Sequence, residues 1–291
     1  MANLTSQAPL QDLHDAYLAD TRRNNLRWLG ICFIFLLLVF LFSWIAEVSP
    51  LKFWKNIGNF NSYIDRILHL DNGDWVVAHP AEWFWGFKKW FLLMLETILM
   101  AYVGTFFGCL GALLLCFLAS QNITKSKTVV FICRRFLEFS RTVPELVFAL
   151  IFVFAFSLGP LPGVLAITIH STGALGKLFA EVVENIDMKP VVGIVSCGGN
   201  WWQKIRFGVI PQVLPNFASY TLLRFEINVR GAAVMGFVGA GGIGETLMTS
   251  IRRFYYSDVS ALLVMIVVTV MLIDVATEKL RHTMMDRESS I

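Results

Sequence analysis

The feature that most constrains this chain is a series of apolar stretches that are each long enough to cross a lipid bilayer. A transmembrane helix needs roughly 20 consecutive apolar residues, and only helices and closed barrels satisfy their backbone groups within lipid. We therefore expect an all-α integral membrane protein with about six transmembrane helices. The stretches cover residues 28–46, 91–118, 136–157, 161–184, 213–238 and 256–276.

The composition agrees with a membrane protein. Of the 291 residues, 56% are hydrophobic and 15% are charged, an apolar share above that of ordinary soluble domains. The net charge of +3 is typical of basic loops held on the cytoplasmic side of a membrane, so we expect no nucleic-acid partner. The five cysteines include no CxxC pair and no close spacing to a histidine, which predicts neither a disulfide framework nor a metal site.

Lysine and arginine are concentrated in the connections that this arrangement places in the cytoplasm, which predicts that both termini lie there. Residues 1–27 then form a cytoplasmic N-terminal segment, 28–46 the first transmembrane helix, and 281–291 a cytoplasmic tail. The pair Arg22-Arg23 superficially matches a twin-arginine export signal. The apolar run that follows is longer than a signal core and has no cleavage site, which favours a retained helix.

Two features outside the long stretches indicate further structure. Residues 47–90 hold five tryptophans, the residue that concentrates at membrane–water interfaces, so we expect an extracytoplasmic segment lying along the bilayer surface. The run Thr142-Val143-Pro144-Glu145 indicates a helix break inside the third stretch. Thr142 is expected to cap the next helix, with Pro144 near its first turn and Glu145 completing a capping box.

A glycine-rich run lies near the C-terminal end of the fifth stretch. Its letters match the GxGxxG dinucleotide fingerprint, but the chain shows no alternation of strands and helices, so we reject nucleotide binding. Irregular backbone at membrane depth is tolerated where it lines a water-filled cavity. We therefore predict that these glycines line the translocation path, with close helix packing as the alternative. They are Gly236, Gly239, Gly241, Gly242 and Gly244.

The long inner connection, residues 181–217, combines apolar anchors with basic residues. Trp201, Trp202, Ile205 and Phe207 alternate with Lys204 and Arg206, after a tight entry at Gly198 and Gly199 and before Pro211. Such a helix suits docking into a groove of a partner protein, and a helix that rests on lipid is the alternative. The chain contains no GxxxxGK[ST] phosphate loop, so any nucleotide hydrolysis must come from a partner.

Residues 198–211 resemble the second half of the cytoplasmic loop of ABC importer permeases, in which a glycine precedes Ile-x-Leu-Pro by nine residues. The first half differs, because Val192-Gly193-Ile194 stands where that family has Glu-Ala-Ala. Other runs narrow the resemblance to permeases of phosphonate-type importers, a group that includes phosphite and hypophosphite permeases. They are residues 142–149, 159–187, 207–215 and 224–244, and the resemblance extends over residues 91–280.

The resemblance implies a type I ABC importer permease fold in a bacterial inner membrane, with its core at residues 91–280 and a cytoplasmic coupling loop at 186–216. It implies a second permease subunit, identical or homologous, two ABC ATPase subunits that bind ATP and Mg, and an extracytoplasmic substrate-binding protein. The chain itself would bind no cofactor. The residues expected at the ATPase are Gly198, Gly199, Trp201, Trp202, Lys204, Ile205, Gly208 and Pro211.

Ionisable residues inside membrane stretches are costly and mark functional or paired sites. His170 and Glu145 are candidates for the translocation path, although His170 could instead bond a neighbouring helix and Glu145 could be a cap. Glu226 and Arg230 are four residues apart on one helical face, which predicts a structural ion pair.

These inferences favour a permease subunit that imports a small phosphorus oxyanion, such as phosphonate, phosphite or hypophosphite, by alternating access. An ABC permease for another small solute such as methionine is the nearest alternative. A membrane-bound enzyme or assembly factor is a third, but no cluster of His, Cys or paired carboxylates suggests such chemistry.

Overall fold

The computed structural model describes residues 8–70 and 72–286. Within that part the chain is helical apart from turns and one isolated bridge between His69 and Trp75. The chain forms two compact units, Met1–Ile64 and Asp65–Ile291.

The first unit contains α1, Ala8–Ile45, and most of α2, Pro50–Leu68. α1 begins about 20 residues before the apolar run because the polar sequence ahead of it is rich in Arg, Leu and Ala, which favour helix. Its portion Ala16–Ile45 is apolar and long enough to span a bilayer. α2 places Phe53, Ile57 and Phe60 on one helical face with polar residues opposite, a pattern typical of helices that lie in a membrane interface.

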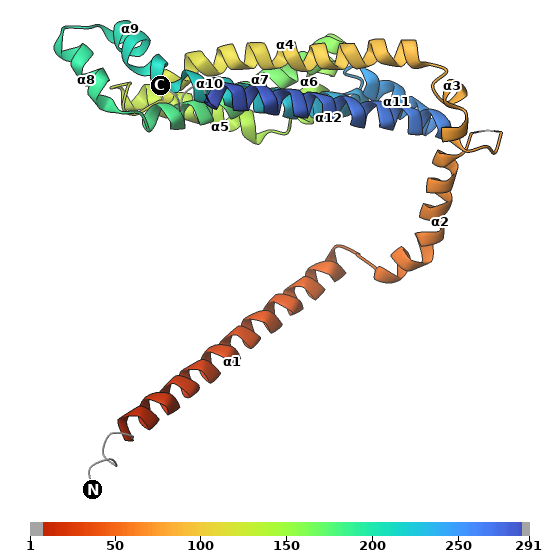
Figure 1. Ribbon diagram of the computed structural model, residues 1–291, viewed down its shortest axis with the longest axis horizontal. Helices are drawn as coiled ribbons and strands as arrows, with labels where there is room; N and C mark the ends of the chain where they lie inside the picture. Colours follow the sequence, from red (N-terminus) through yellow and green to blue (C-terminus); the bar gives the residue numbers. More distant parts are fainter. Residues whose placement is uncertain (1–7, 71, 287–291) are drawn as a thin grey trace. The chain divides into compact units, whose positions relative to one another are not determined.

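The second unit is built on three long helices, α4 (Phe87–Ala119), α7 (Pro160–Glu184) and α10 (Ile210–Met235), with α12 (Tyr256–Asp286) against α10 (Figure 1). Small residues let α4 and α7 approach closely, as is typical of membrane helices. A Cβ atom added at Gly104 would lie 2.6 Å from Ile167, and one added at Gly108 would lie 2.7 Å from Ser171. This close pair forms the centre of the unit.

The third predicted stretch is two helices, α5 (Lys127–Thr142) and α6 (Glu145–Phe156), bent by 87° at Val143-Pro144. Proline disfavours helical geometry in the residue before it, and Val143 is extended with ψ 124°. The predicted break is confirmed, but the predicted capping box is wrong. Thr142 ends α5 and donates to the Glu138 carbonyl at 2.7 Å, while Pro144 occupies the N-cap of α6 and has no side-chain oxygen to offer.

A second bend of 47° separates α10 and the short helix η3 (Gly236–Val238) from α11 (Ile243–Arg252). In the described residues, four helices are long and apolar enough to cross a membrane, or up to six if each bent pair is one span. That upper value agrees with the six helices expected from the sequence. Short helices η1 (Val76–Ala78) and α3 (Pro80–Trp83) precede α4.

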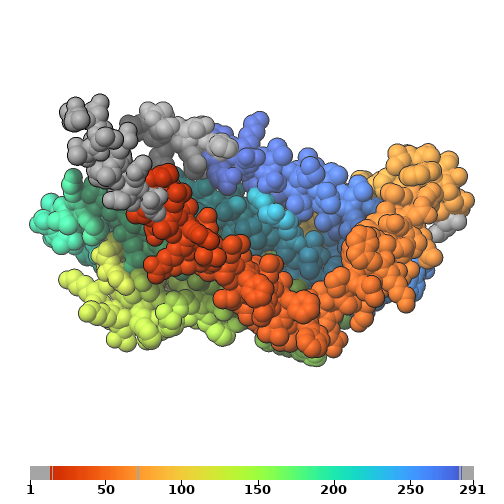
Figure 2. All heavy atoms as spheres, turned by 90° about the horizontal axis from the view of Figure 1, so that it is seen from below, coloured from red at the N-terminus to blue at the C-terminus, as the bar shows by residue number. Residues whose placement is uncertain are grey.

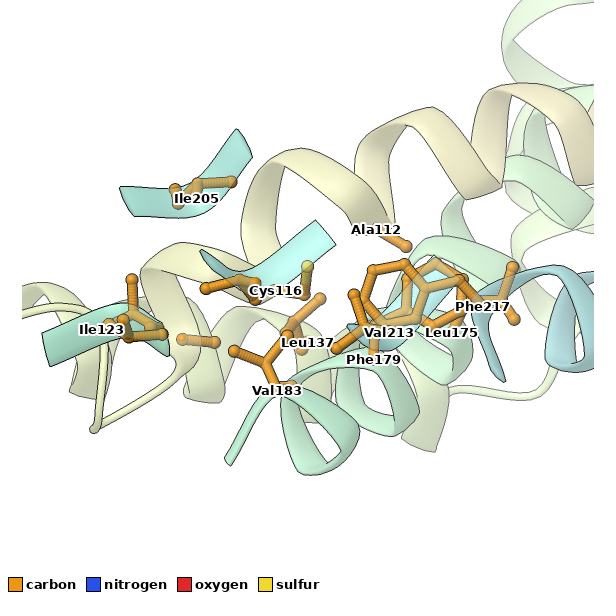
Figure 3. Close-up of a cluster of buried hydrophobic side chains, with 14 residues drawn as sticks. Ala112, Cys116, Ile123, Leu137, Leu175, Phe179, Val183, Ile205, Val213 and Phe217 are labelled. Atoms are coloured by element: carbon orange, nitrogen blue, oxygen red, sulfur yellow. The ribbon is translucent and has the colours of Figure 1, made fainter. Parts of the chain in front are cut away.

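One buried cluster joins α4, α5, α7 and α10 at the end of the unit near the long inner connection. Figure 3 shows Phe179 of α7 and Phe217 of α10 next to each other at one side of the cluster, with their rings stacked and the centroids 4.0 Å apart. Ile123 and Ile205, from two connecting segments, also belong to this cluster. The inner connection is therefore fixed to the helical core by its own buried side chains.

Candidate functional site

The inner connection folds as a helical hairpin of α8 (Met188–Ser196), α9 (Trp201–Gln203) and the π-helical turn η2 (Lys204–Val209). We call residues 188–209 the α8–η2 hairpin. Figure 2 shows it in green to teal at one end of the second unit.

Glycines make the tight turn between the two arms of the α8–η2 hairpin. Gly198 is left-handed with φ +82°. The Gly199 amide donates to the Ile194 carbonyl at 2.9 Å, and the Gly198 amide to Val195 at 3.0 Å. These two bonds form a Schellman motif, which stops α8 where glycine tolerates positive φ. Asn200 and Gln203 then form a reciprocal capping box that starts α9.

One side of the α8–η2 hairpin faces the core. Ile205 is 3% exposed and lies in the buried cluster, Lys204 Nζ donates to the Ile123 carbonyl at 2.9 Å, and Gly208 lies against Val191 and Ile194. Trp201 is half-buried against the same cluster. The expectation that Ile205 is an outward anchor is therefore wrong, because it and its neighbours attach the hairpin to this chain's own helices.

The other side of the α8–η2 hairpin exposes large apolar side chains. Trp202 is 69% exposed, Phe207 63%, Val192 56% and Val195 53%. Pro211, at the start of α10, is exposed as well. Sequence reasoning did not include Val192 and Val195, although the amphipathic pattern of residues 188–196 was a signal for them. We call these four side chains the outer face of the hairpin.

The predicted path glycines lie in a turn, residues 236–244, that is packed against other helices. Gly239, Gly241 and Gly242 have φ of +82°, +80° and +75°, which only glycine adopts readily. A Cβ atom added at Gly244 would lie 2.0 Å from the Ala233 carbonyl oxygen, and one at Gly236 would lie 2.3 Å from the Glu245 nitrogen. These contacts favour the packing alternative for Gly236 and Gly244.

The glycine turn is also tied to α4 and to the start of α7. The Ile243 amide donates to Thr97 Oγ1 at 2.9 Å, and the Gly159 amide donates to the Gly239 carbonyl at 3.0 Å. A Cβ atom at Gly242 would lie 2.5 Å from Thr97 Oγ1. The turn therefore fixes the spacing of α4, α7, α10 and α11, and a role of its glycines in lining the path stays a prediction.

A polar cluster lies among α4, α7 and α10, near the middle of each helix. Asn228 Nδ2 donates to Thr105 Oγ1 at 2.7 Å and to Ser171 Oγ at 2.8 Å. Arg224 Nε donates to the same Ser171 oxygen at 3.3 Å. Asn228, Thr105 and Ser171 are buried. Sequence reasoning missed Asn228 and Thr105 and left Arg224 unassigned, although a charge inside an apolar stretch was a signal for Arg224.

Two further side chains lie at the edge of this cluster, Glu145 at the start of α6, just after the bend, and His170 on α7. Glu145 Oε2 lies 4.0 Å from Arg224 Nη2, with the two side chains 23% and 13% exposed. His170 Nδ1 lies 3.1 Å from the Val143 carbonyl oxygen, a group that the helix break leaves without a helical partner. His170 thus bonds the neighbouring bend, which was the alternative considered for it.

The predicted pair of Glu226 and Arg230 is present on α10. Arg230 Nη2 lies 2.5 Å from Glu226 Oε1, with the Glu226 side chain 12% exposed and that of Arg230 54% exposed. The carboxylate is thus partly buried and the guanidinium reaches a surface. The contribution of the pair to stability stays a prediction.

Two relatives match about two thirds of this chain. The phosphite transport system permease protein PtxC of Stutzerimonas stutzeri is 40% identical over 204 residues, which are 70% of this chain and 74% of that protein. The phosphate-import permease protein PhnE of Mycolicibacterium smegmatis (strain ATCC 700084 / mc(2)155) is 36% identical over 199 residues, or 68% of this chain. The match spans only 37% of that longer protein.

Solved structures agree on the fold. A chain of the MetNI methionine ABC transporter in inward-facing conformations superposes with a TM-score of 0.57 at 20% identity, over 65% of this chain and 93% of that chain. The chain therefore has the fold of type I ABC importer permeases. The family model "Binding-protein-dependent transport system inner membrane component" matches residues 108–281, from the middle of α4 into α12. This chain belongs to that family of multi-pass membrane transport components.

Proposed function

We propose that this chain is the permease subunit of an ATP-driven importer for a small phosphorus oxyanion, such as phosphonate, phosphite or hypophosphite. The observation that carries the proposal is the 40% identity to a phosphite permease along 70% of this chain. A second relative, 36% identical, is named a phosphate-import permease. The two names differ in the anion and share its chemistry, so the class of substrate is better supported than any one member.

The partners follow from membership of a binding-protein-dependent family. The permease pairs with a second permease subunit, identical or homologous, and receives substrate from an extracytoplasmic binding protein. Two ATPase subunits bind ATP and Mg and contact the outer face of the α8–η2 hairpin. The large exposed apolar side chains of that face support this contact, since such patches mark protein interaction sites. Both termini lie in the cytoplasm, as the distribution of basic residues favours.

Transport proceeds by alternating access. Closure of the ATPase pair moves the α8–η2 hairpin, and the buried attachment of Ile205 carries that motion into α4, α7 and α10. The helices rock as rigid bodies about a central substrate site. The glycine turn, tied to four helices, keeps their spacing during the motion, and the polar cluster offers hydrogen-bonding groups at the depth where an anion has to cross.

The methionine alternative has less support. The methionine transporter chain is 20% identical to this chain. Identity at that level supports a shared fold and does not support a shared substrate.

Growth and uptake test the proposal. A strain that lacks this chain should fail to grow on phosphonate, phosphite or hypophosphite as sole phosphorus source and recover when the chain is restored. The reconstituted complex should take up the same anion with ATP and the binding protein, while methionine is the negative control. Uptake of methionine and of no phosphorus oxyanion would reject the proposal.

A further inference from the structure

The polar cluster contains an arginine whose hydrogen-bonding capacity is largely unused. A guanidinium has five N–H donors, and Arg224 makes one hydrogen bond to a described side chain, from Nε to Ser171. Its nearest carboxylate oxygen, Glu145 Oε2, is 4.0 Å away, beyond hydrogen-bond distance. A charge held near the middle of an apolar helix is costly and marks a substrate or ion pathway.

The carboxylate is equally incomplete. Glu145 Oε2 is buried and has no hydrogen-bond partner among the residues that the structure describes. Space for the Glu145 side chain comes from Gly231, where an added Cβ atom would lie 2.2 Å from Glu145 Oε1. Buried polar groups are nearly always hydrogen-bonded, so a carboxylate and a guanidinium that face each other without a bond call for an explanation.

A second Glu–Arg pair, which lies entirely on α10, provides a comparison. Arg230 and Glu226 are in direct contact at 2.5 Å. The contrast indicates that Arg224 and Glu145 compensate each other's charge while leaving donors available.

A groove at His170 carries two basic side chains and one carboxylate. It has a volume of about 320 Å³ and is lined by Arg141 at the end of α5 and by residues of α7, namely His170, Ala174, Lys177, Leu178 and Glu181. His170 also bonds the Val143 carbonyl, immediately before the helix that carries Glu145, so this side chain links the groove to the bend that positions the carboxylate. Lys177 pairs with Glu181 at 3.4 Å. With Lys177 paired to Glu181, Arg141 gives the groove an excess of positive charge, which favours an anion over a cation.

We propose that Arg224 binds the transported phosphorus oxyanion inside the membrane part of the protein, and that Glu145 is the counterion that the anion displaces. The inference rests on the proposed function and names the site at which that substrate is held. Phosphorus oxyanions present two oxygens that match the fork of a guanidinium. When the Glu145 carboxylate afterwards displaces the anion, it again compensates the charge of Arg224. The anion is then released and does not stay bound to the permease.

The test is phosphite binding to the complete complex of permease and ATPase subunits in nanodiscs, without binding protein, followed as stabilisation against heat. Chloride at equal ionic strength is the reference. Glu145→Gln should lower the phosphite concentration that gives half-maximal stabilisation by about tenfold, because a competing carboxylate is gone. Arg224→Gln should raise that concentration by about 10- to 100-fold, the equivalent of a lost charge-assisted hydrogen bond. Arg224→Lys should fall between, since it keeps the charge and loses the fork.

Glu226→Gln is the matched control and should leave the phosphite response unchanged. Opposite effects of Glu145→Gln and Arg224→Gln support the proposal, since loss of a purely structural pair would harm both variants in the same direction. Equal losses in both variants, or a wild-type response in Arg224→Gln, would overturn it.

Uptake separates this inference from the proposed function. If the wild-type complex takes up phosphite and Arg224→Gln does so at the same rate, the inference alone is wrong. If the wild-type complex takes up no phosphorus oxyanion, the proposed function fails and the inference fails with it.

Discussion

Two glycine turns in this protein have opposite surroundings. At Gly198, in the α8–η2 hairpin, an added Cβ atom would meet nothing within 4 Å. At Gly244, in the turn of residues 236–244, the same atom would lie 2.0 Å from the Ala233 carbonyl oxygen. Both turns use left-handed glycines, but Gly198 needs only backbone freedom, whereas Gly244 needs the absence of a side chain. Gly199, next to Gly198, is close-packed against its own hairpin, since an added Cβ atom would lie 2.6 Å from the Ile194 side chain. Glycine-rich sequence therefore does not by itself distinguish an outward turn from a helix contact.

The difference extends to the side chains around each turn. The α8–η2 hairpin presents Trp202 and Phe207 outward, whereas the glycine turn is closed by Thr97 and the start of α7. Surfaces that bind partners have to remain exposed, and contacts that hold membrane helices together have to exclude other atoms. We infer that the hairpin contacts a partner protein and that the glycine turn sets the spacing of the helices around it.

The largest effect is expected for Gly244→Ala. The new methyl group would overlap the Ala233 carbonyl, so α10 and α11 would have to separate. Overpacking usually costs about 1–3 kcal/mol, and we expect a cost above that range because the overlap is with backbone at 2.0 Å. The loss of stability is measured as the decrease in the midpoint of thermal unfolding of the detergent-purified protein. Gly193→Ala is the control, because Gly193 lies in α8 with nothing within 4 Å and alanine favours helix. Equal midpoints for the two variants would contradict the contrast between the turns.

The next largest effect separates the two sides of the hairpin. Ile205→Ala removes a buried side chain and should lower the free energy of unfolding by about 2–5 kcal/mol. Phe207→Ala, two residues along, removes an exposed ring and should change stability by about 0.5 kcal/mol or less. Thermal unfolding checks both, and a larger loss for Phe207→Ala would show that the assignment of inner and outer sides is reversed.

Gly198→Ala should have a smaller effect. The left-handed conformation costs an alanine about 1 kcal/mol, and the methyl group itself finds open space. Stability should fall by that amount while binding of the ATPase subunits is retained. Loss of ATPase binding with an intact fold would show that Gly198 itself lies in the contact.

The smallest effect concerns Glu226 and Arg230. Because the Arg230 side chain is 54% exposed, the pair is not enclosed by this chain, and we expect a coupling of about 0.5 kcal/mol, as for exposed pairs. Thermal unfolding of Glu226→Gln, Arg230→Met and the double variant measures that coupling. A coupling of about 3 kcal/mol would instead indicate a fully buried pair.

The helical architecture could be predicted from the sequence, because a long apolar run can satisfy its backbone hydrogen bonds within a membrane only as a helix or in a closed barrel. The bend at Pro144 also followed from local rules. The capping box did not, because tertiary contacts draw Glu145 toward Arg224 and Thr142 bonds within its own helix. Similarly, Ile205 and Phe207 are alike in the sequence, and only the path of the π-helical turn η2 decides that one is buried and the other exposed.

The glycines and the polar cluster show a second limit of the sequence. Periodicity indicates that α4, α7 and α10 are helices but not which faces meet, so the contact of Asn228 with Thr105 and Ser171 could not be foreseen. Only Arg224 carried a signal on its own, as a charge inside an apolar stretch.

The most direct test of the account is the amount of ATPase subunit that co-purifies with a variant whose outer face is altered. Trp202→Asp replaces an exposed apolar side chain with a charged one. The Trp202 ring contacts Trp201, with the centroids 4.8 Å apart, but does not belong to the buried cluster. We predict that the ATPase is lost from the purified complex while the thermal midpoint of the permease stays at the wild-type value. Retention of the ATPase at the wild-type ratio would contradict the claim that this hairpin makes the contact.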